Sequence, residues 1–414
     1  MNSESERRTL HIESLAHLGA GIARDGGKVV FVPYTAPGDL VRARLVEDKP
    51  RFARAVLEEV LEPSPYRVDP LCPYFGDCGG CQWQHVDYAT QTQYKSRIMA
   101  EQLAHVGRLP GVDVRPTIGM GDPWGYRNSA RLTVGPNGAL GFQRAESHEV
   151  VAVEDCLILH PLLRDLLRTL DVEFPELRAL TLRASTRTGE RMIVLETAGD
   201  EPPEMEVDIP VSCVLALEDG RVATLIGETA IHEEVAGRRY RISPTSFFQV
   251  NTWGAERLVE IVAEALEPQG WERLLDLYCG VGLFGLALAG RVGEVVGVES
   301  APSAVADALV NAEGMDNVTL VEGFAEEAMA ALEGGFDLAI VDPPRGGVHP
   351  AALRALVEKR PRRIAYVSCE PTTLARDCAA LAGAGYRLRW VQPVDMFPQT
   401  YHIESVALLE VAGS

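Results

Sequence analysis

Hydrophobic and polar positions follow a short-strand pattern in the first part of the chain. Over residues 10–61, brief apolar runs alternate with turn signals such as Gly19-Ala20-Gly21 and Pro37-Gly38-Asp39. Residues 29–32, 40–45 and 54–60 are the clearest of these runs. Apolar runs bounded by turn residues predict strands. About five such strands fit a small closed β-barrel, an architecture that often contacts oligonucleotides.

The pattern then changes twice. Residues 87–106 predict one helix with Asp87 as its N-cap, and residues 113–240 predict short strands of an antiparallel α+β domain. From about residue 255, strands alternate with helices, which indicates a parallel, doubly wound sheet. We therefore predict a multidomain chain: a small all-β barrel over 1–62, a central α+β domain over 63–245, and a Rossmann-like α/β domain over 246–414. The helix within residues 84–112 is placed in the central domain.

Charge limits the range of partners. The 414 residues carry 39 basic and 59 acidic side chains, for a formal charge of −20. This balance argues against a general polyanion binder, because phosphate contacts need Lys and Arg. A local basic surface is still compatible with it. Five cations cluster within the predicted barrel and form either a charge-mixed strand edge or a nucleic-acid face: Arg42, Arg44, Lys49, Arg51 and Arg54.

Nothing in the sequence predicts a membrane protein. No apolar stretch reaches the roughly 18 residues of a membrane span, and Met1–Thr9 lacks the apolar core of a secretory signal. We expect a cytoplasmic, monomeric protein. In that compartment cysteines stay reduced, and they bind metal or do chemistry.

Three cysteines stand close together as C-x5-C-x2-C, at Cys72, Cys78 and Cys81. Cys156 is the best candidate for a fourth ligand. All-cysteine sites suit zinc or iron–sulfur clusters. Zinc sites commonly use paired C-x2-C knuckles, and here only one close pair exists, so a 4Fe–4S cluster is favoured. The alternative is a set of unrelated buried cysteines.

Cys369 lies between a predicted strand, residues 364–367, and a predicted helix, residues 372–381. A thiol at a helix start faces the positive end of the helix dipole, which favours the thiolate. This position suggests a nucleophile for covalent catalysis. The alternative is a buried cysteine at a strand end.

A strand, a glycine turn and a helix start follow one another over residues 273–285, with Tyr278 and Gly280 in the turn. This is a weak nucleotide-site signal by itself. Glu299 ends the next strand, 23 residues after Asp276, where a carboxylate can accept hydrogen bonds from ribose hydroxyls. Dehydrogenases share that feature. Asp342-Pro343-Pro344 is typical of methyltransferases acting on planar nitrogen or on bases, although Asp and Pro also favour an ordinary turn.

Together these motifs resemble the S-adenosylmethionine-dependent RNA uridine-5-methyltransferase family over nearly the whole chain. The barrel resembles a TRAM domain, and the cysteines match family members that carry a 4Fe–4S cluster. Both features resemble the 23S ribosomal RNA branch more than the compact bacterial transfer-RNA branch. The motifs that carry the resemblance are residues 246–251, 278–280, 342–345, 368–369 and 402–405.

The resemblance implies roles for individual residues. Cys369 is implied to be the nucleophile, Glu404 the general base, and Phe247 the platform that stacks on the target base. It also implies that the helix after the cysteines packs with the catalytic domain. The residues expected to bind S-adenosylmethionine are Gln249, Tyr278, Gly280, Glu299 and Asp342.

The chemistry of uracil calls for such residues. Carbon 5 is a poor nucleophile until a thiolate adds at carbon 6, and a base must later remove the carbon-5 proton. Two other classes stay open at this point. A base-amine methyltransferase would use Asp342-Pro343-Pro344 without a thiol, and a non-catalytic RNA-binding assembly factor would keep only the fold.

Two positions depart from the family pattern. Leu283 stands where a polar residue is common and cannot hydrogen-bond a cofactor through its side chain. Glu370 stands where many members have Asn, and a carboxylate pointing at the thiol would raise the pKa of Cys369. We expect Glu370 to point away or to cap the helix.

Overall fold

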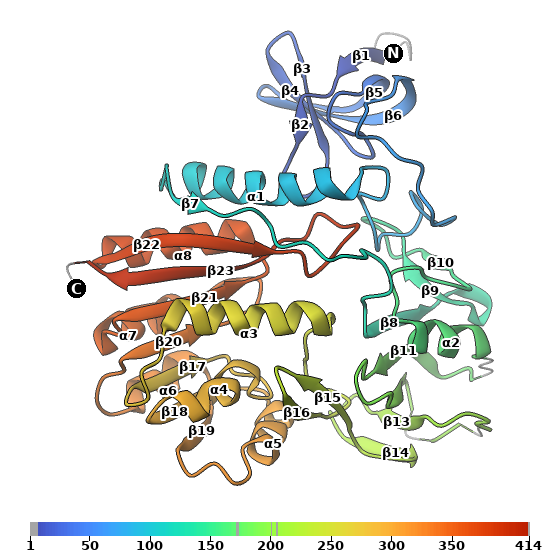
Figure 1. Cartoon of the computed structure of the whole chain (residues 1–414). Coiled ribbons are helices and arrows are strands. Elements are labelled where there is room, and N and C mark those ends of the chain that lie inside the picture. The colour runs from blue at the N-terminus through green and yellow to red at the C-terminus, as the bar shows by residue number, and fades with distance from the viewer. Residues whose placement is uncertain (1–6, 171–173, 200, 204–205, 413–414) are drawn as a thin grey trace.

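The computed structural model describes residues 7–170, 174–199, 201–203 and 206–412. The first six residues of the predicted barrel segment 1–62 therefore lie outside the described residues. The N-terminal β-domain sits at one end of the molecule, and helix α1 separates it from the large C-terminal domain (Figure 1). The central sheet lies beside the C-terminal domain (Figure 1).

The N-terminal domain is a single coiled sheet with strand order β1-β5-β6-β4-β3-β2. Four of the five strand pairings are antiparallel, β4 pairs parallel with β6, and β1 also packs against β3. The all-β prediction is confirmed, with six strands in place of about five because a two-residue strand joins the sheet. The strands are β1 (Arg7–His11), β2 (Ser14–Leu15), β3 (Gly21–Asp25), β4 (Lys28–Val32), β5 (Leu40–Asp48) and β6 (Phe52–Glu62).

Helix α1 (Tyr88–His105) forms where the sequence predicts it. The Asp87 side chain caps it by accepting a hydrogen bond from the backbone N–H of Thr90 at 3.0 Å, which satisfies one free N–H of the first turn. Its buried side chains Ile98, Met99 and Leu103 join a hydrophobic core with residues of the C-terminal domain. The helix thus packs on the C-terminal domain although it follows the cysteines in sequence.

The central domain is a seven-stranded sheet of order β10-β9-β8-β11-β12-β13-β14. Helix α2 (Pro161–Thr169) covers one face with three leucines. All neighbouring strands run antiparallel except β12 and β13, which are parallel. The strands are β8 (Ser129–Val134), β9 (Leu140–Gln143), β10 (Val150–Ala152), β11 (Leu177–Ala184), β12 (Arg191–Thr197), β13 (Ser212–Ala216) and β14 (Val222–Ile226), with a short 3-10 turn at Pro136–Gly138.

A hairpin of β15 (Ile231–Val235) and β16 (Arg238–Ile242) connects the central and C-terminal domains. Its buried side chains Val235, Tyr240 and Ile242 pack into the core of the C-terminal domain. The same core also includes Met192, Val194 and Val214 of the central sheet. The domain boundary at 245/246 stays a prediction.

The C-terminal domain is an eight-stranded sheet of order β19-β18-β17-β20-β21-β23-β22-β7. The first five strands of this order are parallel, β23 is antiparallel to both of its neighbours, and β7 from the segment after α1 pairs with the outer edge. The strands are β7 (Asp113–Val114), β17 (Arg273–Leu277), β18 (Glu294–Glu299), β19 (Val318–Glu322), β20 (Leu338–Val341), β21 (Arg363–Ser368), β22 (Tyr386–Val394) and β23 (Glu404–Val411).

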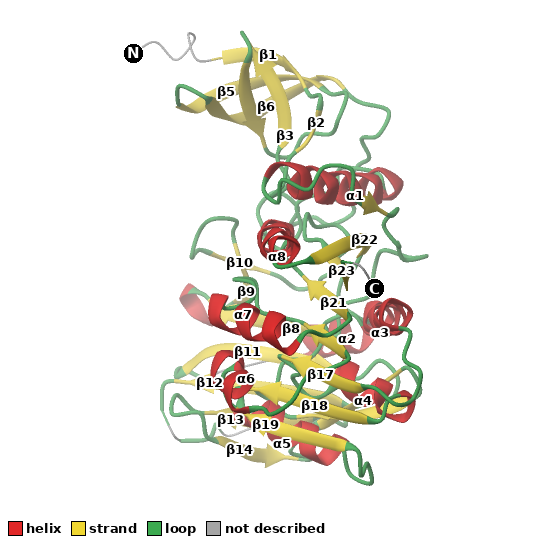
Figure 2. Cartoon of the chain, turned by 90° about the vertical axis from the view of Figure 1, so that its left-hand side faces the viewer, coloured by secondary structure: helices red, strands yellow, loops and turns green. Residues whose placement is uncertain are grey.

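Helices cover both faces of this sheet (Figure 2), so successive strand residues are buried in two different cores. Leu274 and Ile340 face a core that includes α3, α4 and α5, whereas Leu275 and Val341 face one that includes α1, α6, α7 and α8. The doubly wound sheet predicted from residue 255 is confirmed. The helices are α3 (Thr252–Leu266), α4 (Leu283–Leu288), α5 (Pro302–Asn311), α6 (Ala325–Ala331), α7 (Pro350–Lys359) and α8 (Pro371–Gly383), with a 3-10 turn at Ala289–Arg291.

Among the described helices, none has both the length and the apolar character needed to cross a membrane.

Candidate active site

Four strand ends bring the predicted site residues to one edge of the C-terminal sheet. In the registers of the parallel strands, Leu277 lies opposite both Val298 and Val341, and Val341 lies opposite Tyr366. The residues at or just beyond these strand ends therefore lie side by side, in the crevice where open α/β sheets bind ligands. They are Tyr278, Glu299, Asp342 and Cys369.

The glycine turn after β17 is tied to Glu299. Glu299 Oε2 accepts a hydrogen bond from the backbone N–H of Gly280 at 2.9 Å, and Oε1 accepts from the N–H groups of Ser300 and Ala301 at 2.7 and 2.8 Å. The hydroxyl of Ser300 also donates to Oε1 at 3.4 Å. Because each carboxylate oxygen has about two acceptor positions, the remaining capacity for a ligand hydroxyl is on Oε2. At Gly282 (φ 91°) a Cβ would lie 2.5 Å from the Leu286 side chain, so this turn needs glycine.

Two carboxyl groups near the turn have raised pKa values: Asp276, which is buried, and Asp342, which is half-buried. Burial is the largest cause that raises the pKa of Asp342 to about 7, with the charge of Glu299 adding to it. Burial likewise raises the pKa of Asp276 to about 7. Asp276 Oδ2 accepts from the N–H of Gly285 at 2.8 Å, whereas Oδ1 has no hydrogen-bond partner within the described residues. Asp276 is thus enclosed beneath the turn, whereas Asp342 is only partly enclosed and is the one that a ligand at this edge can reach.

The side chains of Cys369 and Glu404 come together because β21 and β23 are antiparallel neighbours. Ser368 lies opposite Ser405 in that register, so the residue after β21 lies next to the first residue of β23. Glu404 is only 3% exposed. Burial is the main cause that raises its pKa well above the usual value, and the charge of Asp342 adds to this effect.

The thiol of Cys369 shares this environment. Burial first and the charge of Glu404 second raise the pKa of Cys369 to about 11, whereas Arg345 acts in the opposite direction. Arg345 also lowers the pKa of Glu404. The thiol of Cys369 therefore keeps its proton near neutral pH in the free protein, and Arg345 is the cation that favours its loss. Sequence reasoning assigned Arg345 no role, although it directly follows the Asp-Pro-Pro turn.

Glu370 points away from the thiol, as predicted. Its side chain caps α8 by accepting from the N–H of Thr372 at 3.2 Å, and its Oε1 lies 3.1 Å from His17 Nε2. The hydrogen bond from His17 is the largest cause that lowers the pKa of Glu370 to about 2. The charge that most raises the pKa of Cys369 is thus that of Glu404. No local signal could have identified His17, which belongs to the N-terminal domain.

The segment that precedes Glu404 is held by a buried ion pair. Lys95 Nζ of α1 lies 2.6 Å from Asp395 Oδ1, and both side chains are completely buried. Lys95 also donates to the carbonyl of Phe397 at 3.0 Å. Removing one partner of a buried pair costs roughly 3–5 kcal/mol because the other charge is left uncompensated. This contact therefore orders the approach to Glu404.

Phe247 projects from the loop between the hairpin and α3. It is 68% exposed, whereas its neighbour Phe248 is buried against Tyr240 with ring centroids 6.2 Å apart. The buried guanidinium of Arg183 orders this loop by donating to the carbonyls of Ser243 and Ser246, both at 2.7 Å. Gln249 is buried in the same loop.

Leu283, the other departure from the family pattern, is a core residue whose carbonyl accepts from the hydroxyl of Tyr240 at 3.0 Å.

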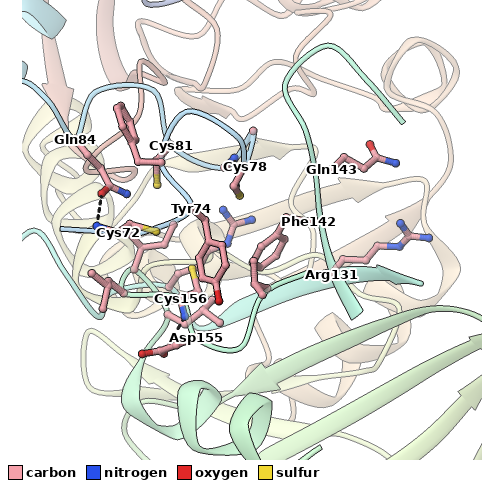
Figure 3. Close-up of a pocket in the computed structure, with 18 residues that line it drawn as sticks. Cys72, Tyr74, Cys78, Cys81, Gln84, Arg131, Phe142, Gln143, Asp155 and Cys156 are labelled. Atoms are coloured by element: carbon pink, nitrogen blue, oxygen red, sulfur yellow. Dashed lines mark hydrogen bonds between the residues drawn. The ribbon is translucent and has the colours of Figure 1, made fainter. Parts of the chain in front are cut away.

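The four predicted metal ligands line one cavity of about 270 Å³ in the central domain. Figure 3 shows Cys72, Cys78, Cys81 and Cys156 around this space, from the loop before α1 and from the segment before α2. Within the described part of the chain, no three His, Cys, Asp or Glu side chains are grouped closely enough to hold a single metal ion.

The cations of the N-terminal domain are largely compensated by its own acids. Arg42 pairs with Glu59, Arg44 with Glu58 at 3.4 Å, and both Lys49 and Arg54 pair with Glu47 at 3.3 and 3.4 Å. Arg51 forms no ion pair with any described residue. This face is therefore a charge-mixed strand edge in the free protein, and its contact with RNA stays a prediction.

Comparison with known proteins gives consistent matches along the chain. Residues 226–412 match the family model of tRNA (uracil-5-)-methyltransferases, and residues 4–57 match that of the TRAM domain. An RNA methyltransferase of Thermosynechococcus vestitus is 39% identical over 97% of both chains. One of Halalkalibacterium halodurans is 37% identical over 97% of this chain and 96% of the relative.

A solved structure resembles the whole fold. It is the tRNA (uracil-54, C5)-methyltransferase of Pyrococcus abyssi in complex with S-adenosyl-L-homocysteine. The TM-score is 0.77 at 29% identity, and the match covers 97% of this chain and 100% of that one.

Proposed function

Because this chain belongs to the RNA uracil-5-methyltransferase family and is an RNA (uracil-5-)-methyltransferase, we propose that it methylates one or more specific uridines of 23S ribosomal RNA through a covalent adduct of Cys369. The observation that carries the proposed mechanism is the register of β21 and β23, which places Cys369 beside Glu404 at the cofactor edge of the sheet.

The residues suit a sequence of balanced steps. The thiolate of Cys369 adds to carbon 6 of the uracil, and the electron pair moves to carbon 5. Carbon 5 then takes a methyl group. The carboxylate of Glu404 removes the proton from carbon 5, and the bond between Cys369 and carbon 6 breaks to release 5-methyluridine and the thiolate.

S-adenosylmethionine supplies the methyl group as an electrophile on a cationic sulfonium. The site suits such a ligand because Glu299 keeps acceptor capacity on Oε2 and Asp342 follows the neighbouring strand end of the same sheet edge. We propose that these residues bind it together with the remaining predicted set: Gln249, Tyr278 and Gly280.

Ribosomal RNA is proposed because the four cysteines around one cavity resemble that branch of the family. The TRAM domain does not discriminate, because the match to the transfer-RNA enzyme of Pyrococcus abyssi covers 97% of this chain. Transfer RNA is the second candidate, because the similar solved enzyme of Pyrococcus abyssi acts on it. The base-amine alternative loses its support, since both the family model and the solved relative concern carbon 5 of uracil. A cytoplasmic location and a monomeric state stay predictions.

The substrate is tested with RNA from a strain that lacks this protein. The purified enzyme and labelled S-adenosylmethionine are incubated separately with the 23S ribosomal RNA and the transfer RNA of that strain, and 5-methyluridine is mapped. We expect label in 23S ribosomal RNA at the uridines that lose the modification in the strain. Label confined to transfer RNA would establish the second candidate instead.

The pH dependence of the reaction follows from the protonated thiol of Cys369. Because the pKa of Cys369 is about 11, the thiolate fraction at neutral pH is small and rises with pH. We expect kcat/KM to increase about tenfold per pH unit between about pH 6.5 and 8.5. Arg345→Met should lower the rate at each of these pH values, since it removes the cation that favours the thiolate. A profile that stays flat over this range contradicts the protonated resting state.

Phe247 gives a test of base stacking. Its ring is 68% exposed with no packing role that would explain it, and aromatic stacking on a base is worth roughly 1–3 kcal/mol. Phe247→Ala should therefore lower kcat/KM for RNA about 10–100-fold, whereas Phe247→Tyr should keep most of the wild-type kcat/KM. Unchanged melting temperature and cofactor binding are the controls. Equal activity of the alanine and tyrosine variants would argue against stacking.

We also propose that the cysteine cavity holds a 4Fe–4S cluster, with Cys72, Cys78, Cys81 and Cys156 as its ligands. The support is that all four cysteines line one cavity. A cluster there would join the loop before α1 to the segment before α2, and so brace the central domain.

Anaerobically purified protein should be brown, with a broad absorption near about 400 nm from iron–sulfur charge transfer. Cys81→Ser should lose this band. Cys213→Ser is the matched control, because Cys213 is a buried cysteine of the same domain outside the cavity. A colourless protein containing about one zinc per chain would refute the cluster.

A further inference from the structure

A tight turn of the TRAM domain leaves its own domain and reaches the catalytic domain. It connects β2 with β3 and comes down to the level of α1 (Figure 1). The backbone N–H of Gly19 donates to the carbonyl of Ala16 at 3.0 Å, and that of Ala16 donates to the carbonyl of Ala20 at 2.8 Å. Leu15, which enters the turn, is buried in a core otherwise made by α1 and the C-terminal domain.

One side of this turn is fastened next to the nucleophile. His17 Nε2 lies 3.1 Å from Glu370 Oε1 and 3.3 Å from Thr372 Oγ1. Glu370 directly follows Cys369 in sequence and caps the helix that starts there. The turn is therefore anchored at the helix start that carries the thiol.

The other side is fastened next to the segment that carries the base. The carbonyl of Gly19 accepts a hydrogen bond from Trp83 Nε1 at 2.9 Å. The backbone at Gly19 also lies so close to Tyr401 that a Cβ would be 2.9 Å from its ring. Tyr401 precedes Glu404 by three residues. The turn thus lies between the two segments that present Cys369 and Glu404.

Leu18 stands at the tip of this turn, between the two anchors. Its side chain is 61% exposed and its φ angle is 73°. A left-handed backbone is unfavourable for leucine, and an exposed apolar side chain gains nothing in the free protein. Glycine would remove both disadvantages, so stability of the free protein does not explain the leucine. Strain of this kind in a position fixed on both sides points to function.

We infer that Leu18 is an RNA-contacting wedge, which packs against the base stack at the place that the target uridine leaves. The inference rests on the proposed function, because a base that is modified at carbon 5 by a thiolate must leave its stack. Apolar side chains commonly fill or open such steps in nucleic acids. The TRAM domain then contributes to the active site through one turn, in addition to any contact made by its charged strands.

The test compares two RNAs that contain the same uridine. One is the folded RNA that the wild-type enzyme methylates, taken from a strain lacking the enzyme, and the other is a short unstructured oligoribonucleotide. Leu18→Gly should slow methylation of the folded RNA about tenfold or more, with little change on the oligoribonucleotide, whose base needs no unstacking. The melting temperature should not fall, since glycine relieves the strained φ angle. Leu309→Ala is the control, because Leu309 is an exposed leucine of α5, which packs against β16, β18 and β19, away from the turn.

Binding of both RNAs, measured by fluorescence anisotropy, gives a second readout that does not depend on turnover. A loss of methylation or of binding by Leu18→Gly that is confined to the folded RNA supports the wedge. An equal loss on both RNAs, or no loss on either, overturns it. If the wild-type protein forms no 5-methyluridine at all, the proposed function fails, and the binding comparison still decides the role of Leu18.

Discussion

Replacing Cys369 with alanine is expected to reduce methyl transfer by about 10⁴-fold or more, as loss of a covalent nucleophile does in other enzymes. The reason is chemical, because the other thiol at this sheet edge, Cys279 in the turn after β17, is buried and cannot replace it. Binding of S-adenosylmethionine should be retained, since the predicted cofactor residues lie on other strands. The measurement is transfer of labelled methyl to RNA, together with the covalent adduct that 5-fluorouridine RNA forms with the wild-type enzyme.

Cys378→Ala is the matched control. Cys378 is completely buried on α8, the helix that begins just after Cys369, so its loss tests the helix without touching the nucleophile. The control should keep the fluorouridine adduct and most of the activity. Normal turnover by Cys369→Ala would contradict the covalent mechanism and would favour the base-amine methyltransferase alternative.

The second large effect is expected for Glu404→Gln. Glutamine has the same shape and can occupy the buried position, but it cannot accept the carbon-5 proton. Turnover should fall by about 10²–10⁴-fold. Formation of the adduct should not be blocked, because the substitution removes the charge that, after burial, most raises the pKa of Cys369.

Slow proton removal together with unblocked adduct formation predicts a distinctive product. With ordinary uridine RNA and S-adenosylmethionine, Glu404→Gln should accumulate a methylated RNA still linked to Cys369, visible as a slow band on a denaturing gel. Glu410→Gln on the same strand is the control, because Glu410 lies at the far end of β23 and pairs with Arg363 and Arg389. Release of free 5-methyluridine by Glu404→Gln at the wild-type rate would mean that another group removes the proton.

Much of the architecture could be predicted because it is encoded in short stretches. Apolar runs, turn residues and caps act over a few residues, which is why the barrel strands, the Asp87 cap and the doubly wound sheet were correctly predicted. The positions of the residues at the strand ends could be predicted for the same reason. Parallel strands of one sheet end at one edge, so Tyr278, Glu299, Asp342 and Cys369 had to lie near one another once their strands were recognised.

Other features depend on contacts between distant segments and could not be predicted. The hairpin over 231–242 packs with the C-terminal domain although it follows the central sheet. The barrel cations Arg42, Arg44, Lys49 and Arg54 are paired with acids from neighbouring strands, and a count of charges cannot show this. The proximity of Arg345 to the thiol depends on how the turn after β20 is directed.

The division between sequence and tertiary structure is clearest at the active site. The sequence alone determined which residues have the right chemistry and which strand or helix end carries each of them, because those properties are local. Only the tertiary structure decided what surrounds them. Burial and the charge of Glu404 hold the pKa of Cys369 high, and His17, from another domain, binds the carboxylate of Glu370. Electrostatic and packing effects act through space, so they depend on strand order and domain docking, which no local pattern records.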